Sequence, residues 1–215
     1  MDPLSPPPAL IDPRRLRLDQ ARMLLEQSGQ MELARQPVSE SWLQEVLDGL
    51  CDLSLRDALT GLANRRHFRA VLEREIDRVA RSGESALLLM LDIDHFKRIN
   101  DHYGHSAGDL VIQAVSRRLV ECVRPMDTVA RYGGEEFVIL LPDTTLEDAV
   151  VALTRLQREL TKKFFLHANE KVLITFSAGV TRLGTDDNQA SVIKRADEAM
   201  YQAKQTGKNR VVAAE

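Results

Sequence analysis

The 215-residue sequence lacks the features of a secreted, membrane-spanning or disulfide-rich protein. It contains only two cysteines, Cys51 and Cys122, whose spacing matches neither a disulfide framework nor a metal site. The densest apolar run, ALLLML at 86–91, is far too short to cross a bilayer, and the N-terminus has no basic-then-apolar signal pattern. These absences favour a cytoplasmic protein with reduced thiols and no membrane span.

An excess of basic residues is also missing. The chain carries 29 Lys and Arg against 32 Asp and Glu, a formal net charge of −3, which argues against a protein that coats nucleic acid. A G-x-x-x-x-G-K-[ST] loop is absent, so a nucleotide would not be held in the P-loop manner. What is present, 44% hydrophobic and 28% charged residues, is typical of a globular protein.

Three regions differ in their patterns. Residues 1–13 are proline-rich and predict a flexible lead-in. Within 14–55, apolar residues at helical spacing predict a helix over 14–35 and a second helix capped by Ser39 or Ser41. Both carry a narrow apolar stripe among charges, which suits pairing with another helix, so this region is predicted to serve dimerisation or signalling. Residues 56–215 form the third region.

The third region predicts a mixed α/β sandwich around one sheet. Helices are expected over 64–81, 106–122, 144–160 and 188–205, the second of them opened by a Ser106-x-x-Asp109 capping box. ALLLMLDI at 86–93 predicts a strand buried on both faces, and VLITFSAGV at 172–180 predicts another. Strands over 128–132 and 137–141 meet at Gly133 and Gly134, where positive φ angles would permit a tight antiparallel hairpin.

Acidic residues are predicted to gather at one end of this sheet. Asp92 and Asp94 lie two apart at the end of the buried strand and therefore project from the same face. If the hairpin lies next to that strand, its tip brings Glu135 and Glu136 beside them. Crowded carboxylates are costly unless a cation neutralises them, and oxygen ligands alone favour Mg²⁺ or Mn²⁺ over zinc.

The same acidic residues allow other interpretations. The acids could instead be solvated strand ends paired with Arg131 or Lys97, and the spacing alone leaves this open. Asp92-x-Asp94 resembles the start of an EF-hand loop, but Lys97 and Tyr103 occupy the positions that need glycine and glutamate. That calcium site is therefore excluded.

Three histidines, His95, His102 and His105, could suggest zinc, but no cysteine or spaced glutamate completes a set of ligands. The GHSAG segment leads into a helix whose N-terminus could bind an anion, which alone is a weak signal.

Five motifs stand in order along the chain: DALTGLANRRHF, LDIDHFKRINDHYGHSAGD, RYGGEEF, TFSAGV and RADEAMYQAKQTGKN. Together they resemble the GGDEF-family diguanylate cyclases from about Asp57 to Val212. The resemblance implies a fold like the palm of nucleotidyl cyclases and polymerases. It also implies a homodimer that condenses two GTP into cyclic di-GMP and two pyrophosphates. Glu135 stands where the family's name has aspartate, which exchanges one carboxylate for another.

The resemblance implies roles for single residues in the reaction. Asp92, the main-chain carbonyl of Ile93, Glu135 and Glu136 match the metal ligands. Glu135 also matches the base that helps to deprotonate the ribose 3′-hydroxyl. Lys97 matches a lysine that stabilises phosphate charge in the transition state.

Substrate binding is likewise implied by position. Asn100 and Asp109 match the residues that read guanine, and a carboxylate can accept from guanine N1–H and N2–H₂ together, a donor pair that adenine lacks. The other matching substrate contacts are the main-chain N–H groups of His95 and Phe96, the side chains of His105, Lys204 and Lys208, and Gly133 with Gly134, where a side chain would block the nucleotide.

Arg124-x-x-Asp127, with Arg155 on the following helix, matches an inhibitory site that binds the product in many family members. Two arginines can grip phosphates and stack on guanine. A surface ion pair is the alternative for these residues.

Two rival functions share the fold. A catalytically silent receptor would normally have lost the acids of the hairpin, and both are present in this sequence. A cyclase with altered base choice would gain nothing from Asp109.

Overall fold

The computed structural model describes residue 16 and residues 18–162, 165–167 and 170–214, with the backbone alone described over 160–171. The proline-rich lead-in predicted over 1–13 lies outside these residues. Contacts divide the chain after Leu55 into two units, which we describe separately. Within the described residues, no helix combines the length and apolar character that a membrane span requires.

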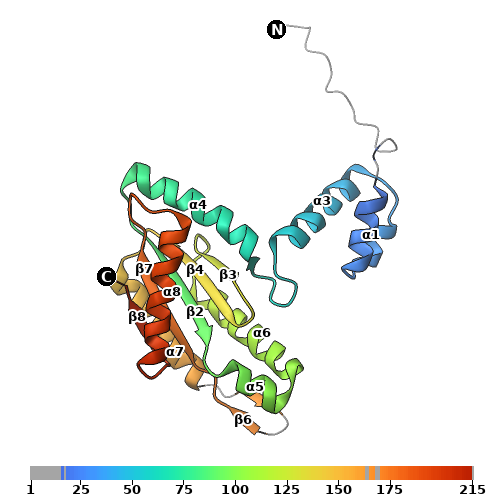
Figure 1. Ribbon diagram of the computed structural model, residues 1–215. Helices are drawn as coiled ribbons and strands as arrows, with labels where there is room; N and C mark the ends of the chain where they lie inside the picture. Colours follow the sequence, from blue (N-terminus) through green and yellow to red (C-terminus); the bar gives the residue numbers. More distant parts are fainter. Residues whose placement is uncertain (1–15, 17, 163–164, 168–169, 215) are drawn as a thin grey trace. The chain divides into compact units, whose positions relative to one another are not determined.

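The first unit consists of the helices α1 (Asp19–Gln27), α2 (Met31–Arg35) and α3 (Glu40–Leu55) (Figure 1). The single helix predicted over 14–35 is wrong, because the chain turns at Gly29, whose φ of 84° is left-handed. Ser39, one of the two predicted caps, does accept a hydrogen bond from the main-chain N–H of Trp42 at 3.1 Å.

A small core holds this unit together. Its buried side chains are Leu25, Ala34, Trp42 and Val46. The indole N–H of Trp42 donates to the carbonyl of Leu33 at 2.7 Å, and the guanidinium of Arg22 lies 4.7 Å from the centre of the Trp42 ring. The apolar stripes predicted for pairing with another helix are therefore partly used within the unit, although Leu47 remains 56% exposed.

The second unit is a six-stranded sheet with strand order β1-β3-β4-β2-β7-β8 and helices on both faces (Figure 1). The inner pairs are antiparallel, whereas β1 runs parallel to β3 and β7 to β8. This confirms the predicted mixed α/β fold. The elements are β1 (Ala63–Asn64), α4 (Arg65–Ser82), β2 (Ala86–Ile93), α5 (Phe96–Tyr103), α6 (His105–Cys122), β3 (Thr128–Arg131), β4 (Glu136–Pro142), α7 (Leu146–Lys162), β7 (Phe176–Arg182), α8 (Gln189–Gln205) and β8 (Val211–Ala213), with a separate hairpin of β5 (Phe165–His167) and β6 (Glu170–Val172).

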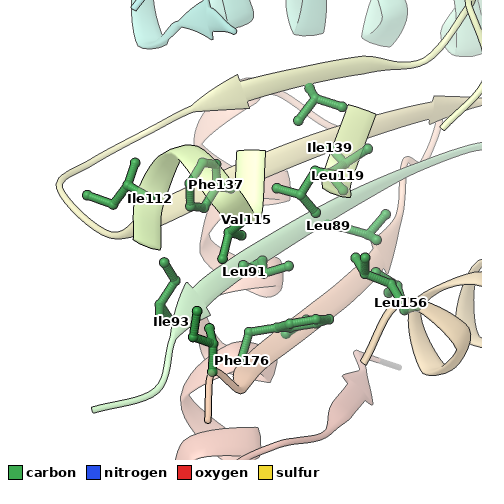
Figure 2. Close-up of a cluster of buried hydrophobic side chains, with 14 of the residues drawn as sticks. Leu89, Leu91, Ile93, Ile112, Val115, Leu119, Phe137, Ile139, Leu156 and Phe176 are labelled. Atoms are coloured by element: carbon green, nitrogen blue, oxygen red, sulfur yellow. The ribbon is translucent and has the colours of Figure 1, made fainter. Parts of the chain in front are cut away.

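Strand β2 lies at the centre of two hydrophobic cores. Leu89, Leu91 and Ile93 point to the face covered by α6 and α7, where they pack with Phe137 and Phe176 (Figure 2). The alternate residues, among them Leu88 and Met90, face α4 and α8. All eight residues of the strand are buried, which confirms the doubly covered strand predicted from its continuous apolar run.

Two other predictions about elements are wrong in detail. Helix α6 begins at His105, directly after Gly104, and has no side-chain cap, so the Ser106–Asp109 capping box does not form. The strand predicted over 172–180 is interrupted, because β6 ends at Val172 and β7 begins at Phe176. In the gap, Thr175 bonds to Asp94 through both its carbonyl and its hydroxyl.

Helix α8 packs against β7 at the closest approach that backbones allow. A Cβ built on Gly179 would lie 2.1 Å from the carbonyl oxygen of Ala196 and 2.3 Å from the main-chain nitrogen of Met200. Neither atom can move without shifting the helix. Gly179 is therefore a packing requirement, and it fixes the height of α8 above the sheet.

We expect Gly179→Ala to lower the free energy of unfolding by roughly 1–3 kcal/mol, because the added methyl group forces α8 away from the sheet. Chemical denaturation measures this loss. The matched control is Gly134→Ala, where the new Cβ meets nothing within 4 Å and φ is not left-handed. That control should change the free energy by less than about 0.5 kcal/mol. Equal losses in the two variants would contradict the packing argument.

Candidate active site

The pairing of β2 with β4 brings the predicted acids together. In this register Asp92 lies opposite Glu136, and the main-chain N–H of Ile93 donates to the carbonyl of Glu135 at 3.3 Å. The hairpin of β3 and β4 is thus the neighbour of β2, as the sequence analysis required. Its tip places two glutamates at the end of the buried strand.

The two glycines of the hairpin do not act as predicted. Neither Gly133 nor Gly134 has a positive φ, so the turn does not depend on left-handed backbone. A Cβ on Gly133 would instead lie 2.3 Å from a carboxylate oxygen of Glu136. Gly133 therefore makes room for the side chain of Glu136, which folds back over the turn.

An arginine holds this turn from within. The guanidinium of Arg131 donates to the carbonyl of Gly134 at 2.8 and 3.1 Å and to the carboxylate of Asp57 at 3.2 and 3.3 Å. Asp57 also accepts from the main-chain N–H and the hydroxyl of Thr60 at 3.0 and 2.8 Å. This brace between Arg131, Asp57 and Gly134 was not predicted. The sequence signals it only through Asp57 and Thr60 of the DALTGL motif, and Arg131 lies 74 residues after Asp57.

The three acids of the site all lie where a negative charge is unfavourable. Burial raises the pKa of Asp92, Glu135 and Glu136 above their ordinary values, and burial is the largest cause for each. The charge of Asp92 raises the pKa of both glutamates further. Lys204 acts in the opposite direction on all three. The site therefore favours an added positive charge.

Lys204 of α8 supplies that charge within the chain. Its ammonium nitrogen lies 2.8 Å from a carboxylate oxygen of Asp92. The cationic partners expected for the acids were Arg131 and Lys97, so this ion pair was not predicted. Within the described residues, no three His, Cys, Asp or Glu side chains form a metal-binding group. The donors predicted for a metal are nevertheless all oxygens with unbalanced negative charge, and this donor set fits a hard divalent cation.

Asp94 does not join the carboxylates at the hairpin. It is only 5% exposed, and its two oxygens accept from the hydroxyls of Thr175 and Ser177 at 2.8 and 2.7 Å. The main-chain N–H of Asn209 donates to it at 3.0 Å. Asp92 and Asp94 are thus only two residues apart but have different partners. Asp92 pairs with Lys204, whereas Asp94 accepts from Thr175, Ser177 and Asn209.

Helix α5 begins beside this end of β2. His95 precedes it in a left-handed conformation, with φ of 59°, and its side chain is exposed. Phe96 is buried in the core, so it anchors the first turn. The first N–H groups of a helix have no acceptor within the helix and can therefore bind an anion. Lys97 is exposed on the same turn.

Asn100 faces α6 across a very close contact. A Cβ on Gly108 would lie 1.9 Å from the side-chain oxygen of Asn100, so only glycine leaves room for the amide. This oxygen is buried and has no hydrogen-bond partner within the described part of the chain. Asp109 follows Gly108 and is exposed, and His105 is the exposed first residue of α6.

The chain leaves α8 through a strained turn. Gly207, Lys208 and Asn209 all have positive φ, at 119°, 60° and 46°. The main-chain N–H of Lys208 donates to the carbonyl of Ala203 at 3.0 Å, which ends the helix. Of the two basic residues predicted for the phosphates, Lys204 thus lies in the last turn of α8 and Lys208 lies in the turn that follows the helix.

The predicted inhibitory residues lie where α6 leads into β3. The main-chain N–H of Arg124 donates to Asp127 at 2.7 Å, and the N–H of Asp127 donates back to the carbonyl of Arg124 at 3.0 Å. The second carboxylate oxygen of Asp127 is buried without a partner in the described residues. Arg155 of α7 is exposed, and its charge acts on the nearby thiol of Cys122.

The chain resembles known proteins in both sequence and fold. Residues 54–210 match the family model of the diguanylate cyclase GGDEF domain. The chain is 41% identical over 174 residues to the response regulator PleD of Caulobacter vibrioides, which covers 80% of this chain and 38% of PleD. It therefore spans less than half the length of that relative.

Two solved structures extend the likeness. The coiled coil and GGDEF domain of DgcB from Caulobacter crescentus, in complex with c-di-GMP, aligns with a TM-score of 0.77 and 31% identity, covering 89% of this chain and 97% of that one. The diguanylate cyclase SiaD from Pseudomonas aeruginosa, in complex with its activator SiaC, aligns with a TM-score of 0.74 and 34% identity, covering 92% and 72%.

We expect Arg131→Lys to loosen the hairpin turn, because an ammonium group lacks the planar fork that reaches Gly134 and Asp57 together. Amide exchange over residues 132–136 should accelerate about tenfold, as expected for the loss of a charged hydrogen-bond pair. Arg66→Lys on the exposed face of α4 is the control, and its exchange should match the wild type. Unchanged exchange in Arg131→Lys would show that the turn needs no brace.

Proposed function

The chain belongs to the GGDEF family of diguanylate cyclases, and we propose on this premise that it condenses two GTP molecules into cyclic di-GMP and two pyrophosphates. The observation that carries the proposal is the meeting of Asp92 with both glutamates of the hairpin, at the end of a strand fixed by two cores. Burial and mutual repulsion leave these carboxylates short of positive charge. A reaction that brings divalent cations and polyphosphate suits such a site.

Mg²⁺ or Mn²⁺ held by Asp92, the carbonyl of Ile93, Glu135 and Glu136 would lower the pKa of the ribose 3′-hydroxyl and shield the α-phosphate under attack. Glu135 is the proposed base that accepts the hydroxyl proton. The bond between Ile93 and Glu135 keeps the base next to the strand end.

Basic groups from two helices would bind the phosphates. Lys97 lies on the first turn of α5, beside the N–H groups of His95 and Phe96 that can face an anion. Lys204 comes from the last turn of α8, and Lys208 from the turn after it. When nucleotide and metal bind, Lys204 would exchange Asp92 for phosphate oxygens, because the metal then balances the charge of Asp92.

Asn100 and Asp109 are proposed to read guanine, with His105 as a neighbouring contact. The unpartnered oxygen of Asn100 supports this role, because a buried acceptor without a donor is costly until a ligand supplies one. Asp109 is exposed and can accept from N1–H and N2–H₂ of the base. At Gly134, where a built Cβ would meet nothing within 4 Å, the hairpin turn leaves space for the nucleotide.

The enzyme is proposed to act as a homodimer, because one subunit holds one GTP and reciprocal attack needs two sites face to face. Residues 14–55 are proposed to support this pairing. Their exposed apolar residues, such as Met23 at 50% and Leu47 at 56%, are the supporting observation. The likeness to DgcB and SiaD extends into this region, and SiaD was crystallised with an activator protein.

Product inhibition is proposed at Arg124, Asp127 and Arg155. Both bonds between Arg124 and Asp127 use only the main chain of Arg124, and the side chain of Arg124 is exposed on the surface. Asp127 also keeps a buried oxygen without a donor in the described residues. A guanine edge and two phosphates would supply both kinds of partner.

The direct test incubates the purified chain with GTP, ATP and Mg²⁺ and identifies the products by mass. We expect cyclic di-GMP from GTP and no adenine dinucleotide. Glu135→Gln should lower the rate at least about 100-fold, because it keeps the shape of the side chain but cannot accept the proton. Removal of divalent cations with a chelator should abolish turnover.

The same assay separates the rivals. GTP binding without any product would support a silent receptor, and a mixed or adenine product would support altered base choice.

Dilution tests the homodimer, because the rate per subunit should fall once the subunits dissociate. A rate per subunit that stays constant down to the monomer, measured by sedimentation, would contradict reciprocal attack.

Gly108→Ala is expected to raise the KM for GTP about tenfold with a smaller change in kcat, because its Cβ would displace the amide of Asn100. A double-mutant cycle provides the control. In an Asn100→Ala background the same glycine substitution should have a much smaller effect on the KM, since the amide is gone and only the contact of the new Cβ with the ring of Phe96 at 3.0 Å remains. Additive losses would mean that Gly108 acts on something other than Asn100.

Arg124→Ala should relieve product inhibition, with the inhibition constant for cyclic di-GMP rising at least about tenfold and the initial rate unchanged. Progress curves with added product measure both quantities. Arg117→Ala, an exposed arginine on α6, is the control and should keep the wild-type inhibition curve. An unchanged curve in Arg124→Ala would place the inhibitory site elsewhere.

A further inference from the structure

We propose that Asp94 is a positioning residue that holds the basic end of α8 over the carboxylates of Asp92, Glu135 and Glu136, and that its carboxylate does not bind the metal. What the end of α8 does there rests on the proposed function. The clamp itself rests on the contacts of Asp94 alone.

The carboxylate of Asp94 is fully engaged by the protein. One oxygen accepts from the hydroxyl of Ser177 at 2.7 Å, and the other accepts from the hydroxyl of Thr175 at 2.8 Å and the main-chain N–H of Asn209 at 3.0 Å. Its own N–H donates to the carbonyl of Thr175 at 2.9 Å. Asp94 thereby connects the ends of β2 and β7 with the turn after α8.

That turn needs an anchor. It contains three successive residues with positive φ, two of which, Lys208 and Asn209, carry side chains. Such a residue is strained and persists only where its surroundings fix it. The N–H of Asn209 binds a buried anion, which makes it a charge-assisted hydrogen bond. Asp94 therefore stabilises the strained conformation at Asn209, while Lys208 is held by its own N–H bond to the carbonyl of Ala203 and by the guanidinium of Arg210, which donates to the carbonyl of Lys208 at 3.1 Å.

Two acids of one strand thus hold the same end of one helix. Asp92 pairs with Lys204 at 2.8 Å, and Asp94 binds the turn that carries Lys208. The first contact is open to exchange, because Lys204 is 31% exposed. The second is buried against Ser177, which is 0% exposed. Lys204 can therefore leave Asp92 for a ligand while the turn stays in place.

A metal role for Asp94 conflicts with the same contacts. A cation at either oxygen would have to replace donors that already point at the carboxylate, and the freed hydroxyls and N–H would lose their acceptor in a buried place. Among the residues that the structure describes, Asp92 has no such competition beyond Lys204. The pair of aspartates two residues apart therefore divides into one ligand and one clamp.

The test compares Asp94→Asn and Thr175→Val with the wild type and with Asp77→Asn, an exposed charge-matched control on α4. Three quantities are measured: amide exchange of Asn209 by NMR, affinity for GTP and for guanosine in the presence of a chelator, and the Mg²⁺ concentration that gives half-maximal turnover. Thr175→Val removes one donor and keeps the shape of the side chain, so it remains informative if Asp94→Asn folds poorly.

We expect Asp94→Asn to accelerate exchange at Asn209 and weaken metal-free GTP binding, each about tenfold, with Thr175→Val weaker in both respects. Guanosine affinity and the half-maximal Mg²⁺ concentration should stay within about twofold, because the base contacts and the metal ligands are intact. A tenfold rise in the required Mg²⁺ with unchanged exchange would make Asp94 a ligand and overturn the proposal.

Equal loss of GTP and guanosine affinity would show general damage to the fold and would also overturn it. Unchanged exchange and unchanged affinity would remove the clamp altogether. The proposed function fails separately: a wild type that makes no cyclic di-GMP refutes the activity, while faster exchange at Asn209 and selective loss of GTP affinity in Asp94→Asn would still establish the clamp.

Discussion

The structure depends on one constraint, which is the register of β2 between two hydrophobic cores. Leu89 and Leu91 are held on one face and Leu88 and Met90 on the other, so a slip by one residue would turn every side chain to the wrong core. With that register fixed, Asp92 must lie opposite Glu136. The repulsion between acids at the end of the strand is thus imposed by apolar packing far from it, and the site can stay charged because the strand cannot move.

The same packing decides which cations can reach the acids. Gly179 lets α8 lie directly on β7, and this brings Lys204 to Asp92. On the other side, Arg131 is engaged by Asp57 and the carbonyl of Gly134, so it shapes the turn and does not neutralise Glu135 or Glu136. One cation is available to exchange partners, and the other is structural. Burial is the largest cause of the raised pKa values of Glu135 and Glu136, and Lys204 opposes it without cancelling it.

Much of this could be predicted from the sequence, because local patterns encode it. The continuous apolar run of β2 and the paired strands around 133–134 are short-range signals, and both were confirmed. The contacts that were missed join distant segments: Asp57 with Arg131, Lys204 with Asp92, and Asp94 with Asn209. No periodicity reports such pairs. The break at 173–175 lies beside another such contact, since Thr175 binds Asp94 through both its carbonyl and its hydroxyl.

The first unit, unlike the second, has a small core and several exposed apolar side chains. Among the described residues of this unit, only four buried side chains form the core, and a core of this size buries too little apolar surface to be strongly stable alone. Met23, Leu24 and Leu47 meanwhile stay about half exposed. A second copy that covered these residues would add hydrophobic stabilisation where the unit has least, so folding of residues 14–55 and pairing of subunits would be coupled. Any influence that shifts this coupling would then change how often two active sites meet.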